Sequence, residues 1–276
     1  MSLVTPRPGP LMIRMDDVGA ASKRHEVYGL TRLALGPFRV PFPGNWLWLK
    51  YLPPIKRWGP YRELSSTEWY AILEMLAEAG ARMTIAVTAA WVEDDGTLTP
   101  FPRKFPEATR AIRKGVDAGL IEVANHGLTH CLLTGRAFRP RVFTGNRPYH
   151  REFYDFVPAA TQEANIERAQ VILSDAFGGP IVTLVPPGNL LQPVTAEIAR
   201  RHGVRYLSYG APTSRDGILP VVGNECGVVF HDRDVVLEGL GWLRARLAEV
   251  RGREVRFVRE LGERLARPSG TAAEFS

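Results

Sequence analysis

Two adjacent carboxylates, Asp16 and Asp17, stand directly after a short apolar run at residues 11–15. Neighbouring carboxylates repel each other, so a fold keeps them together chiefly where a cation or a proton relay uses them. The pair is therefore a candidate for metal binding or for general acid–base chemistry. The alternative is an ordinary pair of aspartates at the turn that follows a strand.

Two histidines four residues apart form the second candidate. His126 and His130 lie in the run NHGLTH at residues 125–130, and on a helix this spacing puts both rings on one face. Two imidazoles and one carboxylate make a three-ligand site with open coordination positions, as in catalytic zinc sites. The spacing alone also fits two histidines at a helix end that bind no metal. Together with an Asp-Asp pair at another strand end, it favours a metal site.

A third histidine, His231, follows an expected strand at residues 228–230. A histidine at the end of a barrel strand is well placed to act as a general acid or base, whereas the alternative is a capped surface histidine. The run PPGN at residues 186–189 follows another expected strand. Its prolines stiffen the loop and its glycine lets the backbone approach a ligand, so it is a candidate pocket wall.

Alternating strands and helices would position these groups. Ser65 and Glu68 have the spacing of a capping box, which predicts a helix that continues to about Ala79 and ends at Gly80. The same unit of helix, glycine and β-rich run recurs, with helices expected at residues 106–118, 160–177 and 193–202. A long helical stretch, broken at residues 252–257, closes the chain. This rhythm predicts parallel strands with right-handed crossovers, and hence a single α/β barrel domain over residues 1–276.

Two long inserts interrupt the rhythm, at residues 37–58 and 131–157. The first carries six aromatic residues, five prolines and four basic residues, and no acid. This composition suits a membrane surface or a lipid-linked sugar, although aromatic rings that stack on sugars or cap the barrel are the favoured interpretation. In the second insert His150, Glu152 and Phe153 suit a lid, although packing of a surface loop is the favoured interpretation.

Composition bounds the class of protein. The net charge of +6 attracts polyanions, but the C-terminal arginines alternate with glutamates as on a solvated helix face, so no nucleic acid is expected as a partner. Two cysteines, Cys131 and Cys226, fit a reducing compartment, and no apolar segment suits a signal peptide or a membrane span. We therefore expect a cytoplasmic protein. Cys131 adjoins His130, yet adjacent helical residues point about 100° apart, so a buried or lining thiol is expected there rather than a ligand. Oligomeric state is not indicated.

Taken in chain order, these motifs resemble the polysaccharide deacetylase (NodB-homology) family of metal-dependent carbohydrate esterases. The resemblance runs from about Leu11 to Leu265. Its motifs correspond to residues 16–19, 125–130, 186–187 and 230–231, and residues 256–258 are similar to the closing segment of the family. The resemblance implies a distorted (β/α)7-type barrel, with the two inserts as additions.

The resemblance also implies a role for each motif residue. Asp17, His126 and His130 would hold a divalent metal, most commonly zinc, while Asp16 would be the general base and His231 the general acid. The metal would polarise an amide carbonyl and lower the pKa of bound water. Asp16 would accept the proton of that water, and His231 would protonate the departing amine.

Two departures from the family pattern concern the supporting residues. The third family motif usually begins with an Arg that lies beside the catalytic Asp, and here that position is Val185. Arg14, two residues before Asp16 and so on the same side of a strand, is the candidate substitute. The Asp-Trp motif of the family has no clear counterpart after Ser208, where Asp216 is the only candidate.

The expected function is removal of an N-acetyl or similar small acyl group from a sugar, such as a nucleotide- or lipid-linked precursor of a surface glycan. A metal-dependent hydrolase of a non-sugar amide or ureide C–N bond is the alternative enzyme. The alternative class is a non-catalytic barrel that binds glycan or membrane through the Trp-rich insert. The presence of both Asp16 and His231 argues against that class, because a pure binding protein needs neither.

Overall fold

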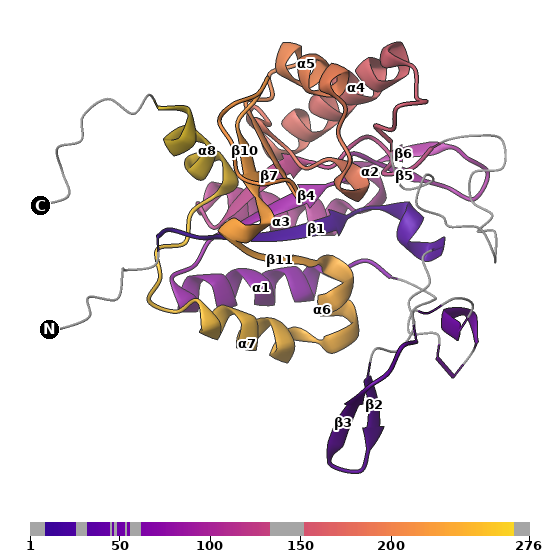
Figure 1. The fold of residues 1–276 in the computed structure, drawn as a ribbon, viewed down its shortest axis with the longest axis vertical. Helices are drawn as coiled ribbons and strands as arrows, with labels where there is room; N and C mark the ends of the chain where they lie inside the picture. Colours follow the sequence, from indigo (N-terminus) through magenta and orange to yellow (C-terminus); the bar gives the residue numbers. More distant parts are fainter. Residues whose placement is uncertain are drawn as a thin grey trace, which may run out of the picture.

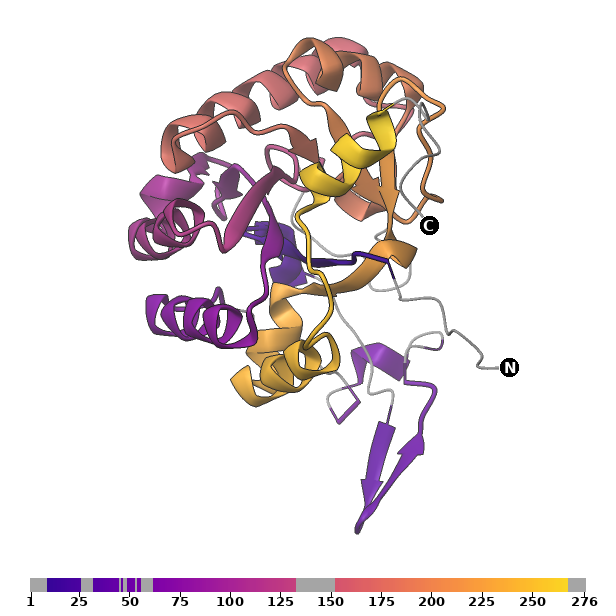
Figure 2. The ribbon, with the colours of Figure 1, turned by 90° about the vertical axis from the view of Figure 1, so that its left-hand side faces the viewer.

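The computed structural model describes residues 9–25, 32–44, 46, 49–52, 54–55, 62–132 and 152–267. At its centre, seven parallel strands form one sheet in the order β10-β9-β8-β7-β4-β1-β11 (Figure 1). The strands are β1 (Met12–Val18), β4 (Met83–Val87), β7 (Ile121–Asn125), β8 (Thr183–Leu184), β9 (Tyr206–Tyr209), β10 (Val221–Gly223) and β11 (Gly227–His231). The sheet is strongly curled, and the predicted α/β fold with a distorted (β/α)7-type barrel is confirmed (Figure 2).

Helices surround the outer face of the sheet (Figure 2). They are α1 (Ser66–Ala79), α3 (Pro106–Asp117), α4 (Ala159–Phe177), α5 (Pro193–Arg201), α6 (Asp232–Glu238) and α7 (Leu240–Glu249). Contacts run from α7 to α1, then to α3, α4 and α5, so each crossover helix packs beside the next. The largest core cluster lies between this ring and β1, β4 and β7, with Leu76, Ile85 and Leu173 fully buried.

The predicted start and end of α1 are confirmed. The Ser65 hydroxyl accepts from the backbone N–H of Glu68, and the Glu68 carboxylate accepts from the backbone N–H of Ser65. Gly80 ends the helix with φ of 61°, a left-handed conformation that glycine adopts without steric cost. The boundaries of the helices predicted at residues 106–118, 160–177 and 193–202 fall within one residue of the prediction, and a glycine with positive φ follows the end of each, at Gly119, Gly178 and Gly203.

Three predicted boundaries were wrong. β1 does not stop before the two aspartates but continues through Asp16 and Asp17 to Val18, with an irregular register between Met15 and Val18. β8, the strand expected before the PPGN run, has only two residues. The closing helical stretch has a second break, at Gly239, which separates α6 from α7 with φ of 82°.

The first insert is more structured than its sequence suggested. The first overlaps an antiparallel hairpin of β2 (Arg32–Leu35) and β3 (Phe38–Pro41), followed by the 3-10 turn η2 (Leu49–Tyr51). Of the second insert, only residues 131–132 and 152–157 are described, so His150 lies outside the described residues. Smaller elements are η1 (Ala21–His25), β5 (Ala90–Val92), β6 (Leu98–Pro100), α2 (Phe101–Lys104), η3 (Pro187–Asn189) and η4 (Asn224–Cys226).

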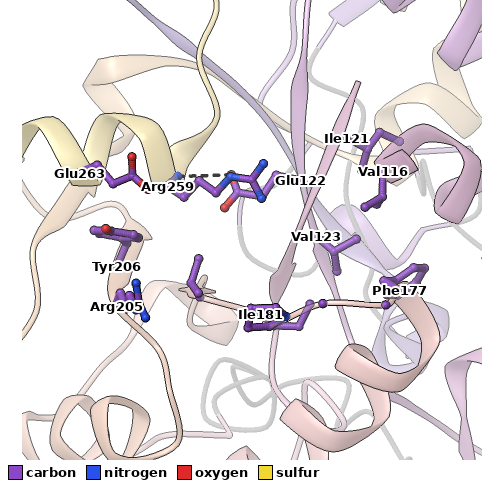
Figure 3. Close-up of a pocket in the computed structure, with 14 residues that line it drawn as sticks. Val116, Ile121, Glu122, Val123, Phe177, Ile181, Arg205, Tyr206, Arg259 and Glu263 are labelled. Atoms are coloured by element: carbon purple, nitrogen blue, oxygen red, sulfur yellow. Dashed lines mark hydrogen bonds between the residues drawn. The ribbon is translucent and has the colours of Figure 1, made fainter. Parts of the chain in front are cut away.

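The last helix, α8 (Val258–Ala266), covers the end of the sheet at which the strands begin (Figure 2). Its first backbone N–H groups donate to the Thr84 hydroxyl and to the Glu122 carboxylate, on the second residues of β4 and β7. A cavity of about 280 Å³ lies beside this junction, lined by Glu122, Arg205 and Arg259 among others (Figure 3). No helix in the described part of the chain is long and apolar enough to span a membrane.

Candidate metal centre and catalytic groups

The motif residues meet at the opposite end of the sheet, where the strands terminate. Asp16 and Asp17 lie near the end of β1, His126 directly follows β7, and His231 is the last residue of β11. Asp16 is paired with His231 in the register of β1 and β11. This edge is where parallel α/β barrels place their chemistry, because the loops that follow the strands converge there.

Asp17, His126 and His130 form one compact, buried cluster. Asp17 Oδ1 lies 3.1 Å from His126 Nε2 and 3.2 Å from His130 Nε2. The three ligand atoms lie within 4.8 Å of one another, and each side chain is nearly inaccessible to solvent. Burial acts to raise the pKa of Asp17, but the charges of His231 and His130, with the hydrogen bonds to His126 and His130, outweigh it and hold that pKa well below its usual range, so the carboxylate is ionised.

The hydrogen bonds of the rings test whether this cluster fits a metal. His126 Nδ1 lies 2.7 Å from the carbonyl oxygen of Val185, which can only accept, so Nδ1 carries a proton. In the neutral ring, Nε2 then presents a lone pair to Asp17 Oδ1, and two acceptors at 3.1 Å need a shared cation or proton between them. His130 Nδ1 is 3.0 Å from the Ser22 hydroxyl, which leaves its Nε2 facing the same space. Two imidazoles and a carboxylate arranged in this way fit a divalent metal.

The segment from His126 to His130 is not helical, so the helical premise behind the four-residue spacing was wrong. Gly127 has φ of 80° and His130 has φ of 58°, and these left-handed residues turn the chain so that the two ring centroids lie 4.7 Å apart. A Cβ at position 127 would stand 2.3 Å from Glu152 Oε2 and 2.9 Å from Pro187 Cγ. Only glycine therefore fits between the two histidines at this point.

Glu152 is the residue that holds this loop in place. Its carboxylate accepts the backbone N–H groups of Leu128, Thr129 and His130, each at 3.1 Å. Burial raises the pKa of Glu152 to about 7, although these hydrogen bonds favour the ionised form. Glu152 and its neighbour Phe153 are both buried, which fits the packing alternative rather than an exposed lid. Sequence reasoning singled out Glu152 but had no signal for its contact with the loop.

Arg14 is the partner of Asp16. Its Nε and Nη2 atoms donate to the two carboxylate oxygens at 2.8 and 2.9 Å, and its Nη1 donates to the Ser208 hydroxyl at 2.6 Å. Burial acts to raise the pKa of Asp16, but the charge and hydrogen bonds of Arg14 outweigh it and lower that pKa. Arg14 thus makes the contact proposed for it, while Val185 packs against Ala86 and Ala124.

His231 is half-buried at the edge of the same site. Its Nδ1 lies 3.5 Å from Asp234 Oδ2, and Asp234 in turn accepts the backbone N–H of His231 at 2.8 Å. Burial acts to lower the pKa of His231, but the charge of Asp17 and the bond to Asp234 raise it. Asp216, the candidate from the sequence, is 90% exposed and faces Arg215 instead. The signal for Asp234 was its position three residues after His231, a capping-box spacing at the start of α6.

Two cations that sequence reasoning missed also contact Asp17. Arg233 Nη1 lies 3.2 Å from Asp17 Oδ2, and its Nη2 lies 3.3 Å from His231 Nδ1. Lys23, fully buried, donates to the backbone carbonyl of Asp17 and pairs with Asp232 and with Glu63. Lys23 thereby stabilises the left-handed backbone of Asp17, whose φ is 69°. No spacing pattern connects these residues in the sequence.

The remaining candidates lie outside the metal cluster. Cys131 is buried among Ala21, Trp91 and Val92, as expected for a lining thiol. Pro187 packs against Gly127 of the histidine loop. The assignment of Asp16 and His231 as catalytic groups and of Asp17, His126 and His130 as ligands stays a prediction that this geometry suits.

Comparison with known proteins gives the family. The crystal structure of a candidate polysaccharide deacetylase from Mycobacterium smegmatis matches at a TM-score of 0.54 and 15% identity, over 96% of this chain and 92% of that one, a likeness of fold. A carbohydrate esterase of family 4 from Streptomyces lividans matches at 0.43 and 16% identity, over 87% and 88% of the two chains. A pseudoenzyme of the same family from Bacillus anthracis matches at 0.44 and 16%, over 71% and 61%. The TM-scores of the last two matches are below 0.5, so these two structures are only distantly similar to this chain.

A search of curated proteins gives no match. The family model for polysaccharide deacetylases matches residues 59–207, more than half of the chain. That range includes His126 and His130, whereas Asp16, Asp17 and His231 lie outside it and are joined to the histidines by the tertiary structure. The chain belongs to the polysaccharide deacetylase family.

Proposed function

We propose that this protein is a metal-dependent hydrolase that removes an N-acetyl or similar small acyl group from a sugar. The observation that carries the proposal is the buried Asp17–His126–His130 cluster, with the Arg14–Asp16 pair next to it in β1. His231 stands opposite Asp16 in the neighbouring strand. The proposed metal ligands, base and acid therefore gather at one end of the sheet, where β1, β7 and β11 terminate.

The residues divide the chemistry between them. A divalent cation held by Asp17, His126 and His130, most commonly zinc, would supply Lewis acidity toward an acyl carbonyl and water. Asp16, kept ionised by Arg14, accepts the proton of the attacking water. His231, whose pKa is raised, donates a proton to the nitrogen that leaves as the amine.

Neighbouring charged residues orient the proposed base, Asp16, and the proposed acid, His231. Arg14 holds both oxygens of Asp16, so the carboxylate cannot rotate away from the site. The Asp234 carboxylate accepts a hydrogen bond from the backbone N–H of His231 and lies beside Nδ1 of its ring. Its negative charge stabilises the protonated ring and fixes the orientation of the side chain. In this way Arg14 and Asp234 supply support that the family draws from the position of Val185 and from a position after Ser208.

We further propose a cytoplasmic glycan precursor as the substrate, since both cysteines are free thiols, as is usual in a reducing compartment. Family membership supports an acylated carbohydrate, while a non-sugar amide or ureide is the alternative substrate and a non-catalytic binding barrel is the alternative class.

The test is metal content together with acyl release. Purified wild type should carry about one equivalent of divalent metal. His126→Ala/His130→Ala should lose that metal and release no acetate or formate from N-acylated sugars. His202→Ala, a histidine that pairs with Glu163 outside the site, is the matched control and should behave as wild type.

Chelation of the wild type should abolish release, and added zinc should restore it. Failure to bind metal even after addition of zinc would refute the proposed site. Metal binding with hydrolysis of simple amides but not of acylated sugars would favour the alternative enzyme. Metal binding without any hydrolysis would favour the binding barrel.

A further inference from the structure

The hairpin of β2 and β3 projects away from the barrel and its helices (Figures 1 and 2). Leu33 is paired with Val40, and Leu35 with Phe38. Because side chains alternate along a strand and paired residues share a face, these four side chains stand on one face of the hairpin. We call this set, Leu33, Leu35, Phe38 and Val40, the apolar hairpin face.

The apolar hairpin face is open to solvent. Phe38 is 71% exposed and Leu35 is 62% exposed, and Leu33 and Val40 are exposed as well. Trp46, a few residues further along the chain, is 65% exposed. Contiguous exposed apolar side chains are uncommon on a soluble protein and mark a surface that another body covers. An isolated two-stranded hairpin also needs such packing for its own stability.

The charge of the surrounding segment indicates what covers this face. Residues 37–58 contain four basic residues and no acid, together with six aromatic residues. A second copy of the chain would bring two such basic segments together, which electrostatic repulsion opposes. An anionic lipid surface instead attracts the basic residues and accepts apolar and aromatic side chains at its interface.

The chemistry of the face distinguishes lipid from sugar. Three of its four side chains are aliphatic, and none of the four offers a hydrogen-bonding group to a hydroxyl. Sugar sites combine aromatic rings with convergent polar groups. An acyl-chain environment needs only the apolar surface that this hairpin presents.

The hairpin also has a definite position relative to the metal cluster. It follows η1, which directly follows the end of β1, and Ser22 of η1 contacts His130 of the cluster. The hairpin therefore branches from the end of the barrel at which the metal ligands and His231 meet (Figure 1).

We propose that the apolar hairpin face inserts into the interface of an anionic membrane, as a monotopic contact that needs no spanning helix. The contact holds the barrel at the bilayer with the end that carries the metal cluster close to the lipid. A consequence, which rests on the proposed function, is that the acylated sugar is carried on a membrane lipid.

The experiment is vesicle flotation of the full-length protein without metal or substrate. Vesicles of phosphatidylcholine alone are compared with vesicles that contain about one third phosphatidylglycerol. Wild type should float with the anionic vesicles and much less with the neutral ones. Leu35→Ser/Phe38→Ser should reduce the partition coefficient on the order of 10-fold or more. Val171→Ser/Val194→Ser, which replaces exposed apolar residues of α4 and α5, is the matched control and should float as wild type.

Flotation lost only in the hairpin variant supports the proposal. Absence of flotation with anionic vesicles, or equal flotation of the hairpin variant, overturns it. The proposal is also overturned if the wild type forms a dimer that the hairpin variant does not form. Binding of the protein to immobilised glycan but not to vesicles overturns it as well. Because no metal or substrate is present, failure here leaves the proposed hydrolase untouched, and absence of acyl release leaves the membrane contact untouched.

Discussion

Two buried carboxylate groups occupy opposite ends of the same sheet, and they differ in what surrounds them. At the end where the strands terminate, Asp16 is held by the guanidinium of Arg14. At the end where the strands begin, the Glu122 carboxylate accepts hydrogen bonds from the hydroxyls of Thr84 and Thr183, each at 2.7 Å. It also accepts a hydrogen bond from the backbone N–H of Arg259 (Figure 3).

The two environments move the pKa in opposite directions. Burial acts to raise the pKa of both groups, but the charge of Arg14 reverses the effect at Asp16, whereas the neutral hydroxyls at Glu122 do not. Asp16 is therefore held in its ionised form, while Glu122 ties α8 to β7 and β8. Burial of a carboxylate alone thus does not determine its charge state, because the charge of its hydrogen-bond donors can reverse the effect of burial.

The largest expected effect is on kcat, and it comes from a substitution at the end of the sheet where the strands terminate. His231→Ala should lower kcat about 10²–10⁴-fold, because a positioned general acid contributes on that order. The side chain of His231 is 34% exposed, so the melting temperature should stay close to that of wild type. Acyl-release kinetics and a thermal melt measure both quantities. Activity equal to that of wild type would remove His231 from the mechanism.

A smaller loss is expected for Arg14→Lys. Lysine keeps the charge but cannot make two parallel hydrogen bonds to Asp16, so kcat should fall about 10-fold with KM and metal content unchanged. Arg82→Lys is the matched control, since Arg82 contacts both oxygens of Glu260 far from the metal ligands, and it should leave kcat unchanged. An equal fall of kcat in both variants would indicate a general structural effect.

At the structural end, Glu122→Gln should change the pH dependence of stability and leave kcat unchanged. The pKa of Glu122 is raised above its ordinary 4.5 in the folded protein, so its protonated form stabilises the fold below pH 4.5 and that contribution is lost as pH rises. Wild type should therefore lose stability relative to the variant as pH rises above 4.5. Urea unfolding of both proteins between pH 4.5 and 8 measures the difference, and parallel curves would contradict the assignment.

The smallest effect is expected for Thr183→Val, which removes one hydroxyl from the Glu122 carboxylate. The free energy of unfolding should fall by about 1 kcal/mol, the net worth of one buried hydrogen bond. Thr88→Val is the control, because the buried Thr88 hydroxyl has no partner among the described residues and its removal should not destabilise the fold. Chemical denaturation compares the two variants, and an equal loss in both would argue against a specific role for the Thr183–Glu122 bond.

Much of the fold and of the site could be predicted because its signals are local. The Ser65–Glu68 capping box, the glycines that end helices and the β-rich runs act over a few residues. Their alternation leads to a parallel sheet, and the ends of its strands lie on one edge. For this reason the amino-acid sequence was enough to assign residues as distant as Asp17, His126 and His231 to one site.

The supporting residues could not be predicted in the same way. Glu152 reaches the backbone of the histidine loop, Lys23 reaches Asp17 and Asp232, and Asp234 lies beside His231 while Asp216 is exposed. Each contact depends on how separate loops fold over the end of the sheet. The helical interpretation of the histidine pair failed for the same reason, since Gly127 and the Glu152 carboxylate set that turn.

The sequence by itself determined the order of strands and helices, the family resemblance and the residue types that can bind a metal or carry protons. The tertiary structure alone decided which charges meet around Asp17, which residue holds the histidine loop, and which apolar face the hairpin exposes. The physical reason is one of range. Backbone preferences and capping act between neighbours in the chain, whereas burial, ion pairing and exposure depend on atoms that only the folded chain brings together.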